Sequence, residues 1–152
     1  MPIKSKDKGD GFEREAVRIL NEKLKYADFK RIPGSGSLGT TLGMPSLTSD
    51  ISGEIDGFPR SLKIEAKVGY GNTKNKEVKS ITLKKEWLDK VKGEAESTYS
   101  IPMLICKFDN VHSGVKYFVS LDFETFAYLA NEISLLKKEL DLVYSKLKEN
   151  DK

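Results

Sequence analysis

The chain has 152 residues, 38% of them hydrophobic and 32% charged, with a formal net charge of +3. This composition predicts one soluble globular domain with a proper core. No apolar run approaches the roughly 18 residues of a membrane-spanning helix, and the N-terminus lacks the apolar segment of a secretory signal. Cys106 is the only cysteine, which excludes an intrachain disulfide or a cysteine-rich zinc site. We therefore expect a cytoplasmic protein with no membrane association.

The first predicted element is a helix that begins near Asp10, after a polar, lysine-rich arm at residues 1–9 that we expect to be flexible. Its apolar residues lie on one arc and are Phe12, Ala16, Val17, Ile19, Leu20 and Leu24. Glu13 falls inside this arc. A carboxylate on an apolar face costs free energy unless it is paired or bound to a metal. Glu13 is therefore either a site residue that faces the sheet or an acid favoured by the dipole of the first helical turn.

A strand is predicted over residues 26–32, with Arg31 near its end. The next segment, residues 33–49, is rich in Gly, Ser, Thr and Pro and has no hydrophobic periodicity. A loop of this length in a compact domain is usually functional or disordered. Its backbone amides and the hydroxyls of Ser35 and Ser37 can meet phosphates. The loop lacks the GxxxxGK[ST] pattern, so we expect no nucleotide cofactor.

Two short strands joined by a turn at Asp56-Gly57 come next, because glycine tolerates a positive φ. Glu65 and Lys67 alternate with apolar residues in the second strand, so they share one face. Asp50 opens the first strand and can lie beside Glu65. Two converging carboxylates repel each other unless a cation lies between them, and their hard oxygens suit Mg²⁺. The alternative is a solvated strand face, because Glu-x-Lys is common in lysine-rich chains.

Residues 63–92 hold nine lysines against four acidic residues. Such a segment beside carboxylates suits a polyanionic substrate held next to a metal, although a solubilising surface is the alternative. Within it, Thr82 has the side chain of an N-cap for a helix over residues 83–97. The apolar face of this helix is made of Trp87, Leu88, Val91 and Ala95.

Two further strands are predicted. Residues 101–108 form a near-continuous apolar run, which is typical of a buried strand and places Cys106 in the core. A turn at residues 110–114 holds His112, to which we assign no role. Residues 116–121 form the next strand.

The last segment of the chain is predicted to be helical. Its apolar residues follow a 3-4 spacing over three heptads and are Phe126, Leu129, Ile133, Leu136, Leu140, Val143 and Leu147. This seam either forms a coiled-coil contact with a partner helix or belongs to an amphipathic helix that lies on the domain's own sheet, broken near Asn131.

In this order, the segments GDGFEREAV, KRIPGSGS, SD, IEAK, LKKEWLDKV and IPMLICKF resemble the archaeal and phage Holliday-junction resolvases of the restriction-endonuclease-like, PD-(D/E)xK superfamily. The resemblance covers residues 9 to about 130, with Ser49 where the name of the superfamily has proline. It implies an α/β fold with a central mixed sheet flanked by helices. The nuclease domain would span residues 10–130, followed by a helical extension at residues 131–152 that is a candidate for dimerisation.

The resemblance also implies the site residues. The metal ligands would be Glu13, Asp50, Glu65 and the backbone carbonyl of Ala66, binding Mg²⁺ with Mn²⁺ as a substitute. Lys67 would be the catalytic lysine, and Ser37 or Ser35 would contact the scissile phosphate. The residues expected on the DNA backbone are Arg31, Ser35, Lys74, Lys76, Lys84 and Lys85.

The function that follows from the resemblance is that of a homodimeric, Mg²⁺-dependent endonuclease. It would cut two opposed strands of a four-way DNA junction symmetrically, in the cytoplasm of its cell or, for a viral chain, of its host. Two alternatives stay open. One is another PD-(D/E)xK nuclease of the restriction or repair type, and the other is a non-catalytic DNA-binding protein on the same scaffold.

Overall fold

The computed structural model describes residues 5–34, 41–44, 48–69 and 76–150. They belong to two compact units, Met1–Leu121 and Asp122–Lys152. Within the described ranges, no helix combines the length and the apolar character that crossing a membrane requires.

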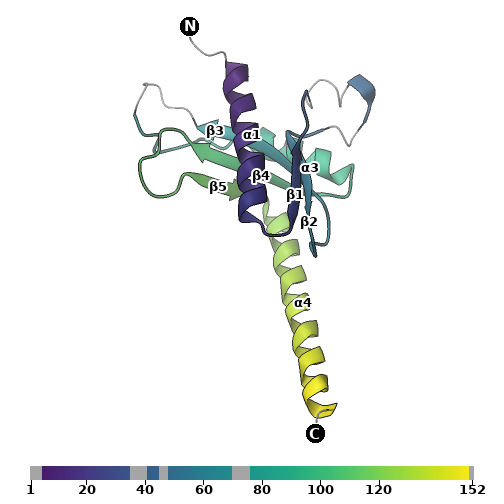
Figure 1. Cartoon of the computed structure of the whole chain (residues 1–152). Helices are drawn as coiled ribbons and strands as arrows, with labels where there is room; N and C mark the ends of the chain where they lie inside the picture. The colour runs from purple at the N-terminus through teal and green to yellow at the C-terminus, as the bar shows by residue number, and fades with distance from the viewer. Residues whose placement is uncertain (1–4, 35–40, 45–47, 70–75, 151–152) are drawn as a thin grey trace. The chain divides into compact units, whose positions relative to one another are not determined.

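A five-stranded mixed sheet is the centre of the first unit (Figure 1). The strands lie in chain order across the sheet and are β1 (Ala27–Arg31), β2 (Ile51–Ile55), β3 (Leu62–Gly69), β4 (Ile101–Phe108) and β5 (Tyr117–Ser120). Only the β3–β4 pair is parallel, and the other three neighbouring pairs of this sheet are antiparallel. The prediction of an α/β fold with a mixed sheet and flanking helices is confirmed.

Two helices, α1 (Ser5–Lys23) and α3 (Lys85–Glu96), cover opposite faces of this sheet (Figure 1). The buried face of α1 carries Phe12 and Ala16, as its periodicity predicts. On α3, Val91 packs with Leu104 and Cys106 of β4. The residues of β3 that pair with these two, Glu65 and Lys67, therefore point towards α3, because partners in a ladder share a face.

The starts of both helices differ from the predictions. The helix α1 begins at Ser5, so residues 5–9 are helical and Asp10 lies inside the helix instead of capping it. No proline interrupts this stretch, and a glycine inside a helix costs only about 1 kcal/mol relative to alanine. The helix α3 begins at Lys85, after the extended residue Lys84, which makes no side-chain cap. Ile81 packs against the core cluster of α3 and β4, which keeps the chain before the helix out of a helical turn.

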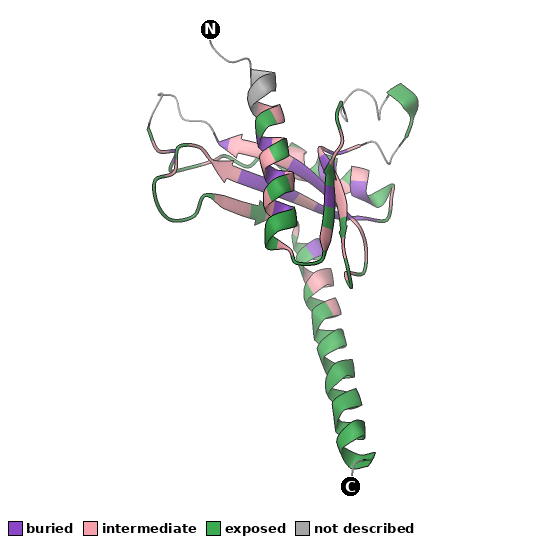
Figure 2. Cartoon of the chain, viewed as in Figure 1, coloured by how far each residue is buried: buried purple, intermediate pink, exposed green. Residues whose placement is uncertain are grey.

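The second unit contains α4 (Phe123–Asn150), a continuous helix without a break at Asn131. Asp122 begins it: its Oδ2 accepts a hydrogen bond of 2.6 Å from the hydroxyl of Thr125, and its Oδ1 accepts one of 3.2 Å from the backbone N–H of the same residue. Most positions of α4 are exposed (Figure 2). The exposed positions include the apolar seam residues Ile133, Leu136, Leu140, Val143 and Leu147.

Candidate active site

Asp50 and Glu65 lie side by side where β2 begins next to β3. The register pairs Ile51 with Ile64, so Asp50 and Glu65 are the next pair along the ladder. The backbone N–H of Ala66 donates a hydrogen bond of 2.9 Å to Oδ2 of Asp50. The two carboxylates are thus held together by backbone geometry, as the alternation in the two strands predicts.

The backbone conformation of Ser49 explains why the chain has no proline before Asp50, where the superfamily motif has one. Ser49 is buried and has a φ of 68°, in the left-handed region. Proline cannot adopt this conformation, because its ring fixes φ near −65°. The hydroxyl of Ser49 donates a hydrogen bond to the carbonyl oxygen of Ile51 at 3.2 Å, which stabilises the turn into β2. The local backbone therefore excludes proline at this position and is compatible with serine.

Glu65 is a buried carboxylate held by two lysines. Its side chain is 4% exposed, and its Oε1 accepts a hydrogen bond of 2.8 Å from Nζ of Lys67. Nζ of Lys90, on α3, donates to Oε1 at 3.0 Å and lies 3.1 Å from Oε2. A buried charge is tolerated only when it is paired and hydrogen-bonded in this way.

Asp50 is electrostatically strained in the metal-free protein. Burial, together with repulsion by Glu65, raises the pKa of Asp50 to about 6; Glu13 adds to this, while the N–H of Ala66 and the charge of Lys67 oppose it. A divalent cation between Asp50 and Glu65 would relieve the repulsion. The donor set of these two carboxylates therefore fits a hard divalent metal ion.

Glu13 contacts an arginine on β1. Its Oε2 accepts a hydrogen bond from Nε of Arg31, and Nη2 of Arg31 lies 2.6 Å from Oδ1 of Asp10. The hydrogen bond with Glu13 raises the pKa of Arg31, against the effect of burial. The carboxylate on the apolar arc of α1 is thus paired. Arg31, predicted to contact DNA, is held by two carboxylates in this state, and its DNA contact stays a prediction.

Glu13 and Glu65 approach the sheet from different faces. Arg31 pairs with Ile51, which pairs with Ile64, so these three residues share the face that α1 covers. Glu65 belongs to the other face. Among the described residues, no group of three or more His, Cys, Asp or Glu side chains is arranged to hold a metal ion. Asp50 and Glu65 are brought together, whereas Glu13 is close enough to Asp50 only to influence its pKa.

Two charged residues of α3 beside Glu65 were missed in the sequence analysis. Lys90 contacts Glu65 directly, and attraction by Glu65 raises the pKa of Lys90 even though burial lowers it. Nζ of Lys90 also lies 3.9 Å from Oε1 of Glu94. Burial raises the pKa of Glu94, and its Oε2 is buried with no hydrogen-bond partner among the described residues. Both residues lie outside the apolar arc of α3 that contains Val91, so the periodicity that drew attention to Glu13 gives no signal for them.

Of the other predicted site residues, Lys67 lies at Glu65 and beside Trp87, whereas the predicted DNA contacts are spread over the surface. Nζ of Lys67 lies 5.1 Å from the centroid of the Trp87 ring, and Nζ of Lys84 lies 5.7 Å from it. Lys76 is exposed, and Lys85 is exposed and forms an ion pair of 2.5 Å with Asp89. The remaining predicted contacts, Ser35, Ser37 and Lys74, lie outside the described residues.

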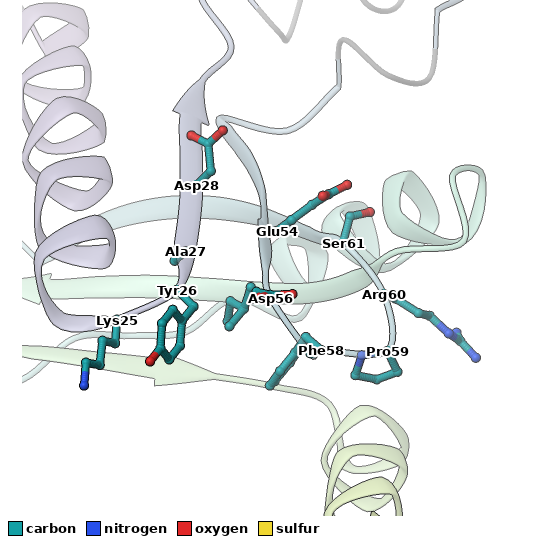
Figure 3. A pocket seen from close by; sticks show the side chains of 12 residues that line it. Lys25, Tyr26, Ala27, Asp28, Glu54, Asp56, Phe58, Pro59, Arg60 and Ser61 are labelled. Atoms are coloured by element: carbon teal, nitrogen blue, oxygen red, sulfur yellow. The ribbon is translucent and has the colours of Figure 1, made fainter.

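A hollow of about 660 Å³ lies at the opposite end of the β1–β2 pair, where β1 begins and β2 ends (Figure 3). It is lined by three acidic residues, Asp28, Glu54 and Asp56, and by two basic ones, Lys25 and Arg60. Asp50 precedes the first residue of β2, so the length of this five-residue strand, roughly 17 Å, separates it from the hollow. The hollow therefore does not belong to the carboxylate site.

Comparison with known protein families identifies a relationship for nearly the whole chain. A family model described as "Phage putative PDDEXK endonuclease" matches residues 4–151, which include all described helices and strands. A search of curated proteins finds no match. Nucleases of the PD-(D/E)xK superfamily usually use divalent metal ions, which agrees with the donor set of Asp50 and Glu65. The chain belongs to this phage PDDEXK endonuclease family and so to the PD-(D/E)xK nuclease superfamily.

Proposed function

We propose that the chain is a Mg²⁺-dependent DNA endonuclease that resolves four-way junctions. One observation carries the nuclease part: Asp50, Glu65 and Lys67 meet where β2 begins beside the middle of β3, with Lys67 bound to Glu65 at 2.8 Å. This arrangement matches what phosphodiester hydrolysis needs, namely carboxylate oxygens for a cation and an ammonium beside them.

Each residue of the site has a distinct task in this proposal. A divalent cation held by Asp50 and Glu65, Mg²⁺ or Mn²⁺, would supply charge against the phosphate and lower the pKa of a bound water. Lys67 would orient the attacking water and stabilise negative charge on the phosphate oxygens. Its position is fixed by Glu65 on one side and by the face of Trp87 on the other. Glu13 would join the site only by leaving Arg31, and we keep it as a candidate ligand.

The preference for four-way junctions rests on the resemblance of the sequence to Holliday-junction resolvases. Two opposed cuts on a two-fold-like junction are most simply made by a two-fold dimer, because symmetry then places both sites at once. Contacts to the DNA backbone would be carried by exposed lysines such as Lys84 and Lys85, so binding should depend on shape and on salt.

In this proposal, the helix α4 would contribute a surface to the dimer. Ile133, Leu136 and Leu140 are 63%, 54% and 48% exposed, and they belong to a seam of heptad spacing. An apolar stripe of this length in water is costly unless it packs against something. Because three heptads are short for an isolated coiled coil, we expect α4 to supplement another interface between the two copies.

The proposal is tested with a synthetic four-way junction and a linear duplex of the same arm sequence, each with Mg²⁺ or with EDTA. We expect paired, symmetric cuts in the junction with Mg²⁺ and none with EDTA. Faster cleavage of the duplex than of the junction would favour a restriction or repair nuclease. A failure to cut any DNA with Mg²⁺ or Mn²⁺, combined with tight DNA binding, would favour the non-catalytic alternative.

A further inference from the structure

The carboxylate of Glu65 is held by two ammonium groups. Nζ of Lys90 lies 3.0 Å from Oε1 and 3.1 Å from Oε2, and Nζ of Lys67 lies 2.8 Å from Oε1. The side chain of Lys90 is 45% exposed, whereas that of Glu65 is 4% exposed. Lys90 thus reaches from the solvent side of α3 to the outer edge of a buried carboxylate.

These three contacts take up most of the roughly four lone-pair sites of the Glu65 carboxylate and bring two positive charges to it, so they oppose the approach of a divalent cation. A carboxylate binds a metal ion through the same lone pairs that accept hydrogen bonds from an ammonium group. Lys67 contacts only Oε1, whereas Lys90 spans both oxygens. Lys90 is therefore the group whose departure would open both oxygens of Glu65 to a divalent cation.

A second acceptor for Lys90 lies one helical turn away. Oε1 of Glu94 is 3.9 Å from Nζ of Lys90, and the side chain of Glu94 is 18% exposed. Its Oε2 is buried and has no hydrogen-bond partner among the described residues. A buried carboxylate oxygen left without a partner is costly, and a shift of the Lys90 ammonium towards Glu94 would satisfy it.

We propose that Lys90 is an exchangeable counter-ion: it pairs with Glu65 in the metal-free protein and moves to Glu94 when Glu65 takes up a divalent cation. Lys90 and Glu94 together then set the metal affinity of the site. This inference rests on the proposed function in one respect, namely that Asp50 and Glu65 bind the cation. It assigns positioning roles to two residues outside the Glu-x-Lys motif.

Lys90→Gln, Glu94→Gln and the double variant test the proposal by calorimetric titration of the full chain with Mn²⁺ in the absence of DNA. In Lys90→Gln the oxygens of Glu65 are less occupied, so we expect Mn²⁺ to bind about tenfold more tightly, which corresponds to about 1.4 kcal/mol. In Glu94→Gln the second acceptor is weakened, so we expect weaker binding. Lys90→Arg, which keeps the charge and the contacts, should bind Mn²⁺ nearly as the unchanged protein does.

The double variant separates exchange from a simple change of charge. If Lys90 moves to Glu94, then Glu94→Gln should have little effect once Lys90 is gone, and the two effects should not add. Additive effects, or a Lys90→Gln affinity equal to that of the unchanged protein, would overturn the inference. Lys25→Gln, at the hollow on the opposite end of the β1–β2 pair, is the control for lost charge and should leave Mn²⁺ affinity unchanged.

The outcomes also distinguish a failure of the proposed metal site from a failure of the proposed Lys90 exchange. An unchanged protein that binds no Mn²⁺ or Mg²⁺ overturns the proposed metal site and, with it, the exchange of Lys90. An unchanged protein that binds the metal but shows an additive cycle overturns only the exchange. Circular dichroism of each variant checks that it is folded. Should Lys90→Gln not fold, a Glu94→Gln variant with unaltered Mn²⁺ affinity is sufficient to reject the proposal.

Discussion

Asp50 is fixed to β3 by the backbone of Ala66, whose N–H donates a hydrogen bond of 2.9 Å to Oδ2 of Asp50. This bond spans two strands and places an acidic group beside Glu65. An asparagine can accept the same hydrogen bond through its amide oxygen, so the geometry can be kept while the charge is removed.

The first prediction follows from this bond. Asp50→Asn should abolish Mg²⁺-dependent cleavage and keep junction binding, because it removes charge from the metal site without disturbing the basic surface. Glu65→Gln should behave in the same way. Cleavage and binding are measured on the same labelled junction. Near-normal cleavage by either variant would show that the metal site has been assigned to the wrong residues.

The second prediction concerns stability and pH without metal. The folded-state pKa of Asp50 is raised to about 6 from 3.8, so the folded chain holds this proton more tightly than the unfolded chain does. The contribution of Asp50 to the free energy of unfolding is therefore highest below about pH 4 and falls as the pH rises to about 6. The total loss is at most about 3 kcal/mol.

Asp50→Asn removes this dependence. In urea unfolding with EDTA, the stability of Asp50→Asn relative to the unchanged protein should rise between pH 4 and pH 6 and level off above that. A difference that stays constant over this range would contradict the strained state of Asp50.

The third prediction concerns Lys67. Lys67→Ala should reduce single-turnover cleavage by roughly a hundredfold to a thousandfold, because the ammonium acts on water and phosphate. Metal affinity should stay the same or increase, since Lys67 occupies one oxygen of Glu65 in the metal-free protein. Lys84→Ala, whose ammonium also lies near Trp87, is the control: it should weaken DNA binding but not the rate at saturating enzyme. Unchanged cleavage by Lys67→Ala would leave Glu-Ala-Lys as a charged strand face.

The fourth prediction concerns Glu13 and Arg31. Glu13→Gln should lower the free energy of unfolding of the metal-free protein by roughly 1–3 kcal/mol, because Arg31 is mostly buried and keeps, among the described residues, only Asp10 as a charged partner. Glu22→Gln, which breaks the exposed pair with Arg18 on the same helix, should change stability much less, because solvent screens this pair. Equal effects would show that the contact of Glu13 with Arg31 does not stabilise the fold. Reduced cleavage by a folded Glu13→Gln would support its role as a ligand.

The fifth prediction concerns the proposed dimer. Leu136→Glu combined with Leu140→Glu should weaken self-association, because charges then interrupt the centre of the seam. Lys138→Glu, on the opposite side of the helix, serves as the control. Light scattering at micromolar concentration gives the mass. A monomeric unchanged protein would exclude the dimer, and a dimer unaffected by the double substitution would show that α4 does not hold it.

The part of the site that could be predicted from the sequence is the part set by local geometry. The two-residue period of β3 places Glu65 and Lys67 on one face, and a short connection to β2 brings Asp50 to the same position in the ladder. The contact of Lys90 with Glu65 spans 25 residues and depends on which face α3 covers after the crossover from β3 to β4. Periodicity does not contain that information.

The pairing of Glu13 was unpredictable for the same reason. The apolar arc of α1 indicates that Glu13 faces the sheet, but not that α1 covers the face of Arg31 instead of that of Glu65. The start of α1 was also missed, because a polar run without proline carries no clear signal for a helix or for a loose arm.

The position of the Lys67 ammonium group over the ring of Trp87 allows the site to be followed by intrinsic tryptophan fluorescence. Trp87 is the only tryptophan of the chain, so its emission has a single source. An ammonium group 5.1 Å from the ring centroid alters the field around the indole. A shift of Lys67 on binding of metal or DNA should therefore change the emission wavelength or intensity of the unlabelled protein. Stopped-flow fluorescence then gives the rate of that change, which can be compared with the rate of cleavage under the same conditions.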